Sequence, residues 1–320
     1  MPRTIDTPGL HENPASIVTA ATPTYRSALP YLAMAIGVVA LGFSALFVRW
    51  ANAPGPVTGA YRMGLASIFL FPLAMRRGRG RPWPRLGVAF ALLGGTSLAL
   101  DIALWNTSVN MTKAANAALF GNTAPLWVAL AGWAFFGERL PGLFWAGLGV
   151  TLLGAGAVAG SDFLVHPTLG WGDVLGLLAG VFYAGYYLAT QFGRRHLDSA
   201  RYVWLAGAAS ATCLLIICLV AGLPLTGYSQ QTYLAFAGAA LVTQSIGYLV
   251  VGYALGHLPA SLVSPIMIGQ PVITALLGIP LLGEHLTSVQ WVGGAAVVTG
   301  VYLINRAHTS QVLEPAEANA

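Results

Sequence analysis

The sequence predicts an all-α integral membrane protein with ten transmembrane helices, arranged as two inverted five-helix repeats. Three observations predict this fold class: the scarcity of charge, the length of the apolar runs and an internal repeat. Of the 320 residues, 56% are hydrophobic and only 8% are charged, whereas soluble proteins carry roughly 25% charged residues. So few charges cannot cover a soluble surface, so we expect lipid to be the main solvent.

Ten apolar runs approach the length of about 20 residues that a helix needs to cross a bilayer. The first five cover residues 28–48, 57–75, 86–105, 114–136 and 143–160. The second five cover residues 171–192, 202–222, 233–255, 260–282 and 289–304. We therefore expect two repeats, residues 28–160 and 171–306, between disordered cytoplasmic tails at residues 1–27 and 307–320.

The positive charges predict the orientation of these spans, because cytoplasmic loops carry an excess of Lys and Arg. If the N-terminus is cytoplasmic, so is the C-terminus, and twelve of the 15 Lys and Arg residues fall on that side. They are Arg3, Arg26, Arg76, Arg77, Arg79, Arg81, Arg85, Arg139, Arg194, Arg195, Arg201 and Arg306. Because these charges lie in short clusters between apolar runs, we expect no nucleic-acid partner despite a pI of about 9.4.

A block near the end of the first half recurs near the end of the second half. The segment FGERL at residues 136–140 returns 146 positions later as LGEHL at residues 282–286. Other residues match at the same offset: Pro125 and Pro271, Leu130 and Leu276, Trp145 and Trp291, Gly147 and Gly293, Gly154 and Gly300. Five spans per half would insert the second half upside down, as in transporters that work by alternating access. The alternative is a gene duplication without mechanistic consequence.

These residues also resemble a known family. The matching stretches are residues 42–48, residues 54–75 with Arg62, the block from Pro125 to Leu140, and residues 258–263 leading to Pro271 and Glu284. Together they resemble the EamA branch of the drug/metabolite transporter superfamily, across residues 28–306, with a departure at His285 where Arg is commoner. The resemblance implies an exporter of amino acids or related metabolites, similar to the YddG-type aromatic amino-acid exporters.

Charged residues inside the spans are candidates for function, because charge is costly in the bilayer. Arg62 and Asp101 lie at similar depths in the second and third spans, so an ion pair is possible. This pair is either structural or part of a site for a zwitterionic substrate or a proton. Glu138 and Glu284 end the fourth and ninth spans, where each caps or pairs locally or steadies a gate.

A set of polar and aromatic residues near the middle of the spans is the predicted substrate-binding site. Asn122 and Gln270 each closely precede a proline that is expected to bend its helix. Amide and phenol groups beside bent helices can bind an amino or carboxyl group, while rings line an apolar pocket. The alternatives are interhelical hydrogen bonds and lipid contacts. The full set is Asn122, Gln270, Gln244, Tyr183, Tyr186, Tyr187, Tyr248 and Trp105.

The functional hypothesis is a bacterial inner-membrane transporter that exports small metabolites, first of all aromatic or hydrophobic amino acids, by alternating access at a central cavity. The alternative is a proton antiporter of cationic drugs or other metabolites. A further alternative, from another functional class, is an intramembrane enzyme or channel. The sequence has no nucleotide-binding Gly-rich loop and no metal-binding motif. We therefore expect no cofactor, no metal and no catalytic residues. The expected partners are a small-molecule substrate and the lipid bilayer, and we expect the monomer to be functional.

Overall fold

The computed structural model describes residues 28–111, 120–159, 170–282 and 285–317, and these residues contain helices and no strand. The first half contains α1 (Leu29–Gly42), α2 (Ser44–Ala51), α3 (Gly55–Gly78), α4 (Arg85–Met111), α6 (Ala124–Phe136) and α7 (Gly142–Ala159). The second half contains α9 (Trp171–Gly193), α10 (Ser199–Val220), α11 (Gln230–Gly238), the π-helix η2 (Ala239–Gly247) and α12 (Tyr248–Leu255). It continues with α13 (Ala260–Met267), α14 (Gln270–Leu282) and α15 (Ser288–Glu317).

Seven helical segments of the described chain are long and apolar enough to cross a membrane. Two shorter apolar helices, Ala124–Phe135 and Gly142–Val158, and the long helix α15 accompany them. The segments agree with the predicted fold class of a multi-pass helical membrane protein. Large apolar side chains such as Phe135 and Val220 are 80% and 85% exposed, as expected where lipid takes the place of water.

Three predicted spans are interrupted in the structure. Phe43 separates α1 from α2, a turn at residues 122–123 precedes α6, and a turn at residues 268–269 separates α13 from α14. Pro125 and Pro271 lie in the first turn of the helix that follows each of the last two breaks, where a missing N–H costs nothing. The prolines therefore begin new helices and do not bend continuous ones.

The C-terminal boundary differs from the sequence prediction. We expected a disordered tail from residue 307, but α15 continues to Glu317. Residues 307–314 contain neither glycine nor proline, so no strong helix-breaking residue interrupts the helix before Pro315. The predicted tail at residues 1–27 lies outside the described part of the chain.

One end of the molecule holds the arginine-rich connections together. Arg201 donates from Nε to Asp198 Oδ2 at 2.5 Å and from a terminal nitrogen to the Pro82 carbonyl at 2.9 Å. Asp198 also caps α10 by accepting from the Arg201 backbone N–H at 3.1 Å. Burial alone would raise the pKa of Asp198, but the hydrogen bonds from Arg201 outweigh it and lower that pKa. The α3–α4 and α9–α10 connections thus share one face, as the arginine distribution predicts.

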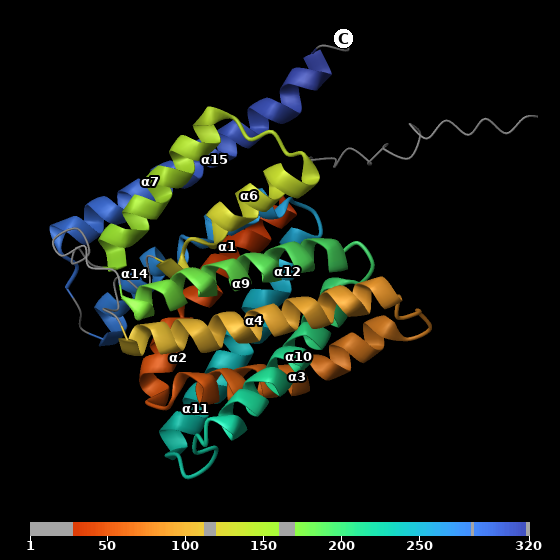
Figure 1. Ribbon diagram of the computed structural model, residues 1–320, viewed down its shortest axis with the longest axis vertical. Helices are drawn as coiled ribbons and strands as arrows, with labels where there is room; N and C mark the ends of the chain where they lie inside the picture. Colours follow the sequence, from red (N-terminus) through yellow and green to blue (C-terminus); the bar gives the residue numbers. More distant parts are fainter. Residues whose placement is uncertain (1–27, 112–119, 160–169, 283–284, 318–320) are drawn as a thin grey trace, which may run out of the picture.

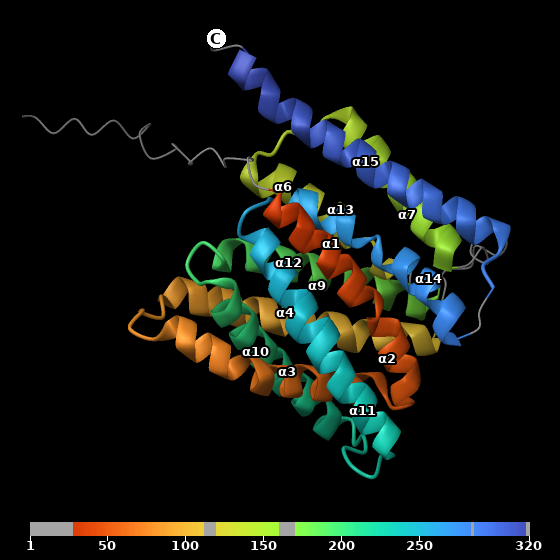
Figure 2. The same ribbon diagram turned by 180° about the vertical axis from the view of Figure 1, so that it is seen from behind.

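Helices α7 and α15 lie side by side along one edge of the molecule (Figures 1 and 2). A Cβ atom added to Gly154 would lie 2.6 Å from the Gly293 carbonyl oxygen, and one added to Gly147 would lie 2.9 Å from the Gly300 oxygen. These distances are too short for any side chain, so glycine lets the two backbones touch. Because residue numbers rise along α7 as they fall along α15, the two helices are antiparallel.

Gly154→Ala therefore lowers stability, because its methyl group meets backbone atoms of α15 that cannot rotate away. We expect a loss of about 1–3 kcal/mol, the usual cost of overpacking a tight contact, measured as a lower thermal midpoint of the full chain in detergent. Gly149→Ala is the matched control on the same helix, because a Cβ atom there meets nothing within 4 Å. Equal midpoints for the two variants would contradict the close crossing.

Candidate functional site

Ser44, at the break between α1 and α2, is the hydrogen-bond partner of Arg62. Arg62, on α3, donates from a terminal nitrogen to Ser44 Oγ at 3.0 Å. Ser44 is the first residue of α2, and the Gly42 carbonyl at the break accepts a hydrogen bond from Thr274 Oγ1 at 2.7 Å. The Nε atom of Arg62 is buried without a hydrogen-bond partner. A buried guanidinium nitrogen that lacks an acceptor is costly, so this side chain has capacity for a ligand.

Asp101, on α4, is the acidic residue that interacts with Arg62. The two side chains interact electrostatically, but the described contacts include no direct ion pair between them. The predicted pair is therefore an interaction at longer range. Asp101 also interacts electrostatically with Tyr183 and Tyr187 on α9. The carboxylate and the guanidinium thus belong to one cluster without neutralising each other directly.

Three predicted tyrosines of α9 lie together and meet a fourth from α12. The Tyr187 hydroxyl donates to the Tyr183 hydroxyl at 3.1 Å, and the Tyr186 ring meets the Tyr248 ring edge-on at 5.4 Å. Tyr248 interacts electrostatically with Arg62, Asp101 and Tyr183. Helix α9 approaches α4 closely because Gly185 has no side chain, and a Cβ there would lie 3.2 Å from Ser97 Oγ.

Gln244 lies on the π-helix η2, which packs against α1 and α3. Its side chain is 2% exposed, and its Oε1 atom is buried without a hydrogen-bond partner. A π-helical segment is less stable than an α-helix and often accompanies a functional site. The sequence predicted Gln244 as a site residue but predicted an ordinary helix around it.

The other predicted site residues lie at the helix breaks, in α4 and just after α6. Asn122 lies in the turn before α6, and Gln270 is the first residue of α14. Trp105 packs against Gly121, where a Cβ atom would lie 2.7 Å from its ring. The Glu138 carboxylate folds back over the end of α6, within 2.7 Å of where a Gly132 Cβ would lie. This position suits a cap, and Glu284 lies outside the described residues.

We use the name central cluster for Arg62, Asp101, Tyr183, Tyr186, Tyr187, Gln244 and Tyr248, with Ser44 as the Arg62 partner. Gln244 is included because η2 packs against α3 and continues into α12. Its members come from both halves of the chain, on α3, α4, α9, η2 and α12. Ser44 is the residue that the sequence analysis missed, although a lone hydroxyl beside Gly42 in an apolar span was a usable signal. The tyrosines at positions 186, 187 and 248 are only 1%, 1% and 5% exposed, so side chains enclose the cluster. The two described cavities lie elsewhere, at the outer edge.

Comparison with known proteins gives three kinds of match. Residues 28–159 and 170–306 match the EamA-like transporter family. A "Probable terminal-alkyne amino-acid exporter" of Streptantibioticus cattleyicolor is 29% identical over 255 residues, which are 77% of this chain and 82% of the relative. The "Uncharacterized inner membrane transporter YedA" of Escherichia coli K12 is 26% identical over 267 residues, 78% of this chain and 81% of the relative.

A protein of known crystal structure shares the fold of this chain. It superposes with a TM-score of 0.70 over 86% of this chain and 96% of its own length. The two sequences are 19% identical, so this likeness concerns the fold alone.

Gln244→Leu tests whether the buried carbonyl of Gln244 is unpaired. Removing an unsatisfied buried acceptor avoids its desolvation cost. We therefore expect Gln244→Leu to raise the thermal midpoint in detergent, with a gain of about 1 kcal/mol in the free energy of unfolding. Gln191→Leu is the matched control, because Gln191 Oε1 accepts from the Ala260 backbone N–H at 2.8 Å. That variant leaves a buried N–H without a partner and lowers the midpoint. A fall for both variants would show that the Gln244 carbonyl is bonded in the folded protein.

Proposed function

Because this chain belongs to the EamA-like transporter family, we propose that it exports amino acids with aromatic or hydrophobic side chains across a bacterial inner membrane. In this proposal both termini lie in the cytoplasm. The chemistry of the central cluster is the observation that carries the substrate class. The relative named "Probable terminal-alkyne amino-acid exporter" supports the same substrate class.

The central cluster offers complementary groups to a zwitterion. The unpaired Nε of Arg62 is a charged donor that suits a carboxylate. The unpaired Oε1 of Gln244 and the carboxylate of Asp101 are acceptors that suit an ammonium group. Helix α3 packs against η2, and Arg62 and Asp101 interact without a direct ion pair. One small ligand can therefore satisfy a positive and a negative group that the protein leaves incompletely paired.

The tyrosines of the central cluster are suited to the apolar side chain of the proposed substrate. The rings of Tyr183, Tyr186, Tyr187 and Tyr248 pack against one another. Three of these residues, Tyr183, Tyr187 and Tyr248, also interact electrostatically with Asp101. Such rings favour aromatic or aliphatic side chains, and they align with other rings at centroid distances of 4.5–7 Å. A zwitterion with a large apolar side chain matches the cluster better than a fully polar metabolite.

The contacts between the two halves support an inverted repeat. Gly147 matches Gly293 in the repeat and Gly154 matches Gly300. In space Gly147 meets Gly300 and Gly154 meets Gly293. Exchanging the two halves therefore turns each contact into the other, which is the property of a two-fold axis through the crossing of α7 and α15.

Other helix pairs follow the same exchange. The first and third spans of the first half pack against the third and first spans of the second half, as α1 with η2 and α12, and α4 with α9. The second spans of both halves, α3 and α10, pack against each other. In our proposal the halves exchange conformations, so that the enclosed central cluster opens alternately to the two sides. A single chain provides both halves, so a monomer suffices.

A second candidate is a proton antiporter of cationic drugs. The observation that favours it is the carboxylate of Asp101 among tyrosine rings, because carboxylates and ring faces both attract organic cations. Arg62 argues against it, since a fixed positive charge repels a cation within the same site.

Counterflow in proteoliposomes tests the transport proposal. Vesicles loaded with unlabelled phenylalanine or leucine are expected to accumulate the labelled amino acid, with and without a pH gradient. Vesicles loaded with a cationic drug or a nucleoside serve as comparisons. Exchange of the cation alone would favour the second candidate. The absence of any exchange by folded protein would remove the carrier proposal.

Asp101→Asn and Arg62→Gln test the roles of the two charges separately. Loss of a charged hydrogen bond of about 1.5–3 kcal/mol corresponds to a loss of roughly 10-fold or more in amino-acid exchange. Arg49→Gln is the control, because it removes an arginine at the end of α2 that is not part of the central cluster. Exchange at the original rate in either folded site variant would exclude that residue from binding.

A further inference from the structure

The two described cavities are the same crevice repeated in the two halves. Crevice A, of about 480 Å³, is lined by Leu130, Leu140 and Trp145, together with Trp133 and Arg139. Crevice B, of about 460 Å³, is lined by Leu276, Leu286 and Trp291, among others. Each of these leucines and tryptophans in crevice B lies 146 positions after its counterpart in crevice A. The repeat has therefore preserved a cavity as well as helices.

The two crevices lie at opposite ends of the α7–α15 pair. Crevice A includes Trp145 in the first turns of α7, and crevice B includes Trp291 in the first turns of α15. The glycine contacts make these two helices antiparallel. The last turns of α7 reach crevice B, where Gln290 Nε2 donates to the Val158 carbonyl at 3.3 Å. When α7 and α15 cross a bilayer, the crevices therefore open into different leaflets.

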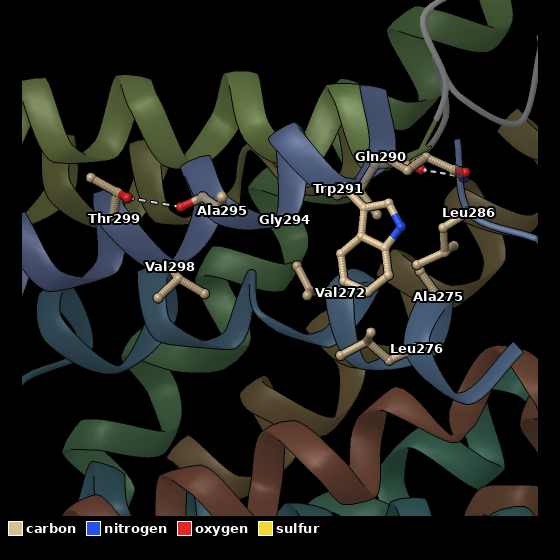
Figure 3. Close-up of a pocket in the computed structure, with 11 residues that line it drawn as sticks. Val272, Ala275, Leu276, Leu286, Gln290, Trp291, Gly294, Ala295, Val298 and Thr299 are labelled. Carbon is tan, nitrogen blue, oxygen red and sulfur yellow. Dashed lines mark hydrogen bonds between the residues drawn. The ribbon is translucent and has the colours of Figure 1, made fainter. Parts of the chain in front are cut away.

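Both crevices open on apolar surface. Trp133 in crevice A and Trp291 in crevice B are 63% and 56% exposed. In crevice B the Trp291 indole lies between α14 and α15, above Val272 and Leu276, with its nitrogen directed toward Leu286 (Figure 3). Tryptophan at a helix end is typical of the membrane interface, where the ring contacts acyl chains and the N–H contacts polar headgroups. Each cavity has a volume in the range of about 300–1,000 Å³ that small ligands occupy.

The crevices differ in charge. Arg139 lines crevice A, whereas its counterpart by the 146-residue offset is His285. Among the residues that the structure describes, none that lines crevice B is charged. The Gln290 side chain there accepts from the Thr287 N–H at 2.9 Å. A guanidinium beside two exposed indoles at a helix end is suited to a phosphate group under an apolar chain.

From this arrangement we propose that crevices A and B are phospholipid-binding sites, one in each leaflet. Crevice A selects an anionic phospholipid through Arg139, and crevice B holds a phospholipid without regard to headgroup charge. The occupant is a lipid because the lining combines exposed indoles, leucines and, in crevice A, one cation at a helix end. A second copy of the chain at this edge is the competing occupant, and the experiment below separates the two.

Native mass spectrometry of the full chain in detergent tests this proposal. The protein is titrated with dioleoylphosphatidylglycerol or dioleoylphosphatidylcholine. We expect one site with about fivefold higher affinity for phosphatidylglycerol, since a basic residue near a membrane surface contributes about 1 kcal/mol. Arg139→Gln removes that preference, while Arg139→Lys retains most of it. Arg85→Gln, at an exposed position at the start of α4, is the matched control and leaves the preference intact.

His285→Arg provides a gain of function in the other leaflet. It supplies crevice B with the arginine that crevice A has, so we expect a second anion-selective site per chain. Equal affinity of the original protein for both lipids, or equal losses in Arg139→Gln and Arg85→Gln, would overturn the proposal. A dimer that dissociates in Trp145→Ala and binds no lipid at this edge would overturn it in favour of a second copy. All variants are first checked for an unchanged thermal midpoint in lipid-free detergent, and Arg139→Lys remains informative if Arg139→Gln does not fold.

Discussion

The lack of hydrogen-bonding partners in lipid is the constraint on which the rest of this structure depends. Every polar group within the apolar spans must find a partner inside the protein. The breaks in the helices follow this rule: Thr274 donates to the Gly42 carbonyl, and Thr123 donates to the Phe120 carbonyl. Among the described residues, three buried side-chain atoms are exceptions: Arg62 Nε, Gln244 Oε1 and Ser210 Oγ. Arg62 and Gln244 belong to the central cluster, whereas Ser210 lies on α10.

The edge and the centre of the fold differ in how their residues pack. At the edge, Gly147, Gly154, Gly293 and Gly300 let α7 and α15 touch along their backbones, a contact with no room for rearrangement. At the centre, tyrosines, an arginine and a carboxylate meet at longer distances. The crossing of α7 and α15 is thus tightly packed, whereas the central cluster retains buried polar atoms without hydrogen-bond partners.

Much of the candidate site was predictable, because charge and amides are conspicuous in apolar spans. Arg62, Asp101 and the tyrosines at positions 183, 186, 187 and 248 were predicted and interact with one another. Gln244 was predicted as well and lies on η2, which packs against α3. Asn122 and Gln270 were predicted from the same reasoning and lie at the helix breaks, and Trp105 packs against Gly121. Composition shows that a side chain is polar and at mid-depth, but the rotation of each helix decides which way that side chain points. Ser44 was missed because its importance comes from a contact with another span.

The sequence by itself determined the helical membrane class, the apolar segments and the 146-residue repeat. These features depend on hydropathy and local composition, which act along the chain and can be read from it. The tertiary structure decided where the spans break, which predicted residues meet, and that the repeat preserves a crevice at each end of the α7–α15 pair. Those features depend on packing between segments far apart in the chain. A glycine contact such as Gly154 with Gly293 exists only once two helices have met.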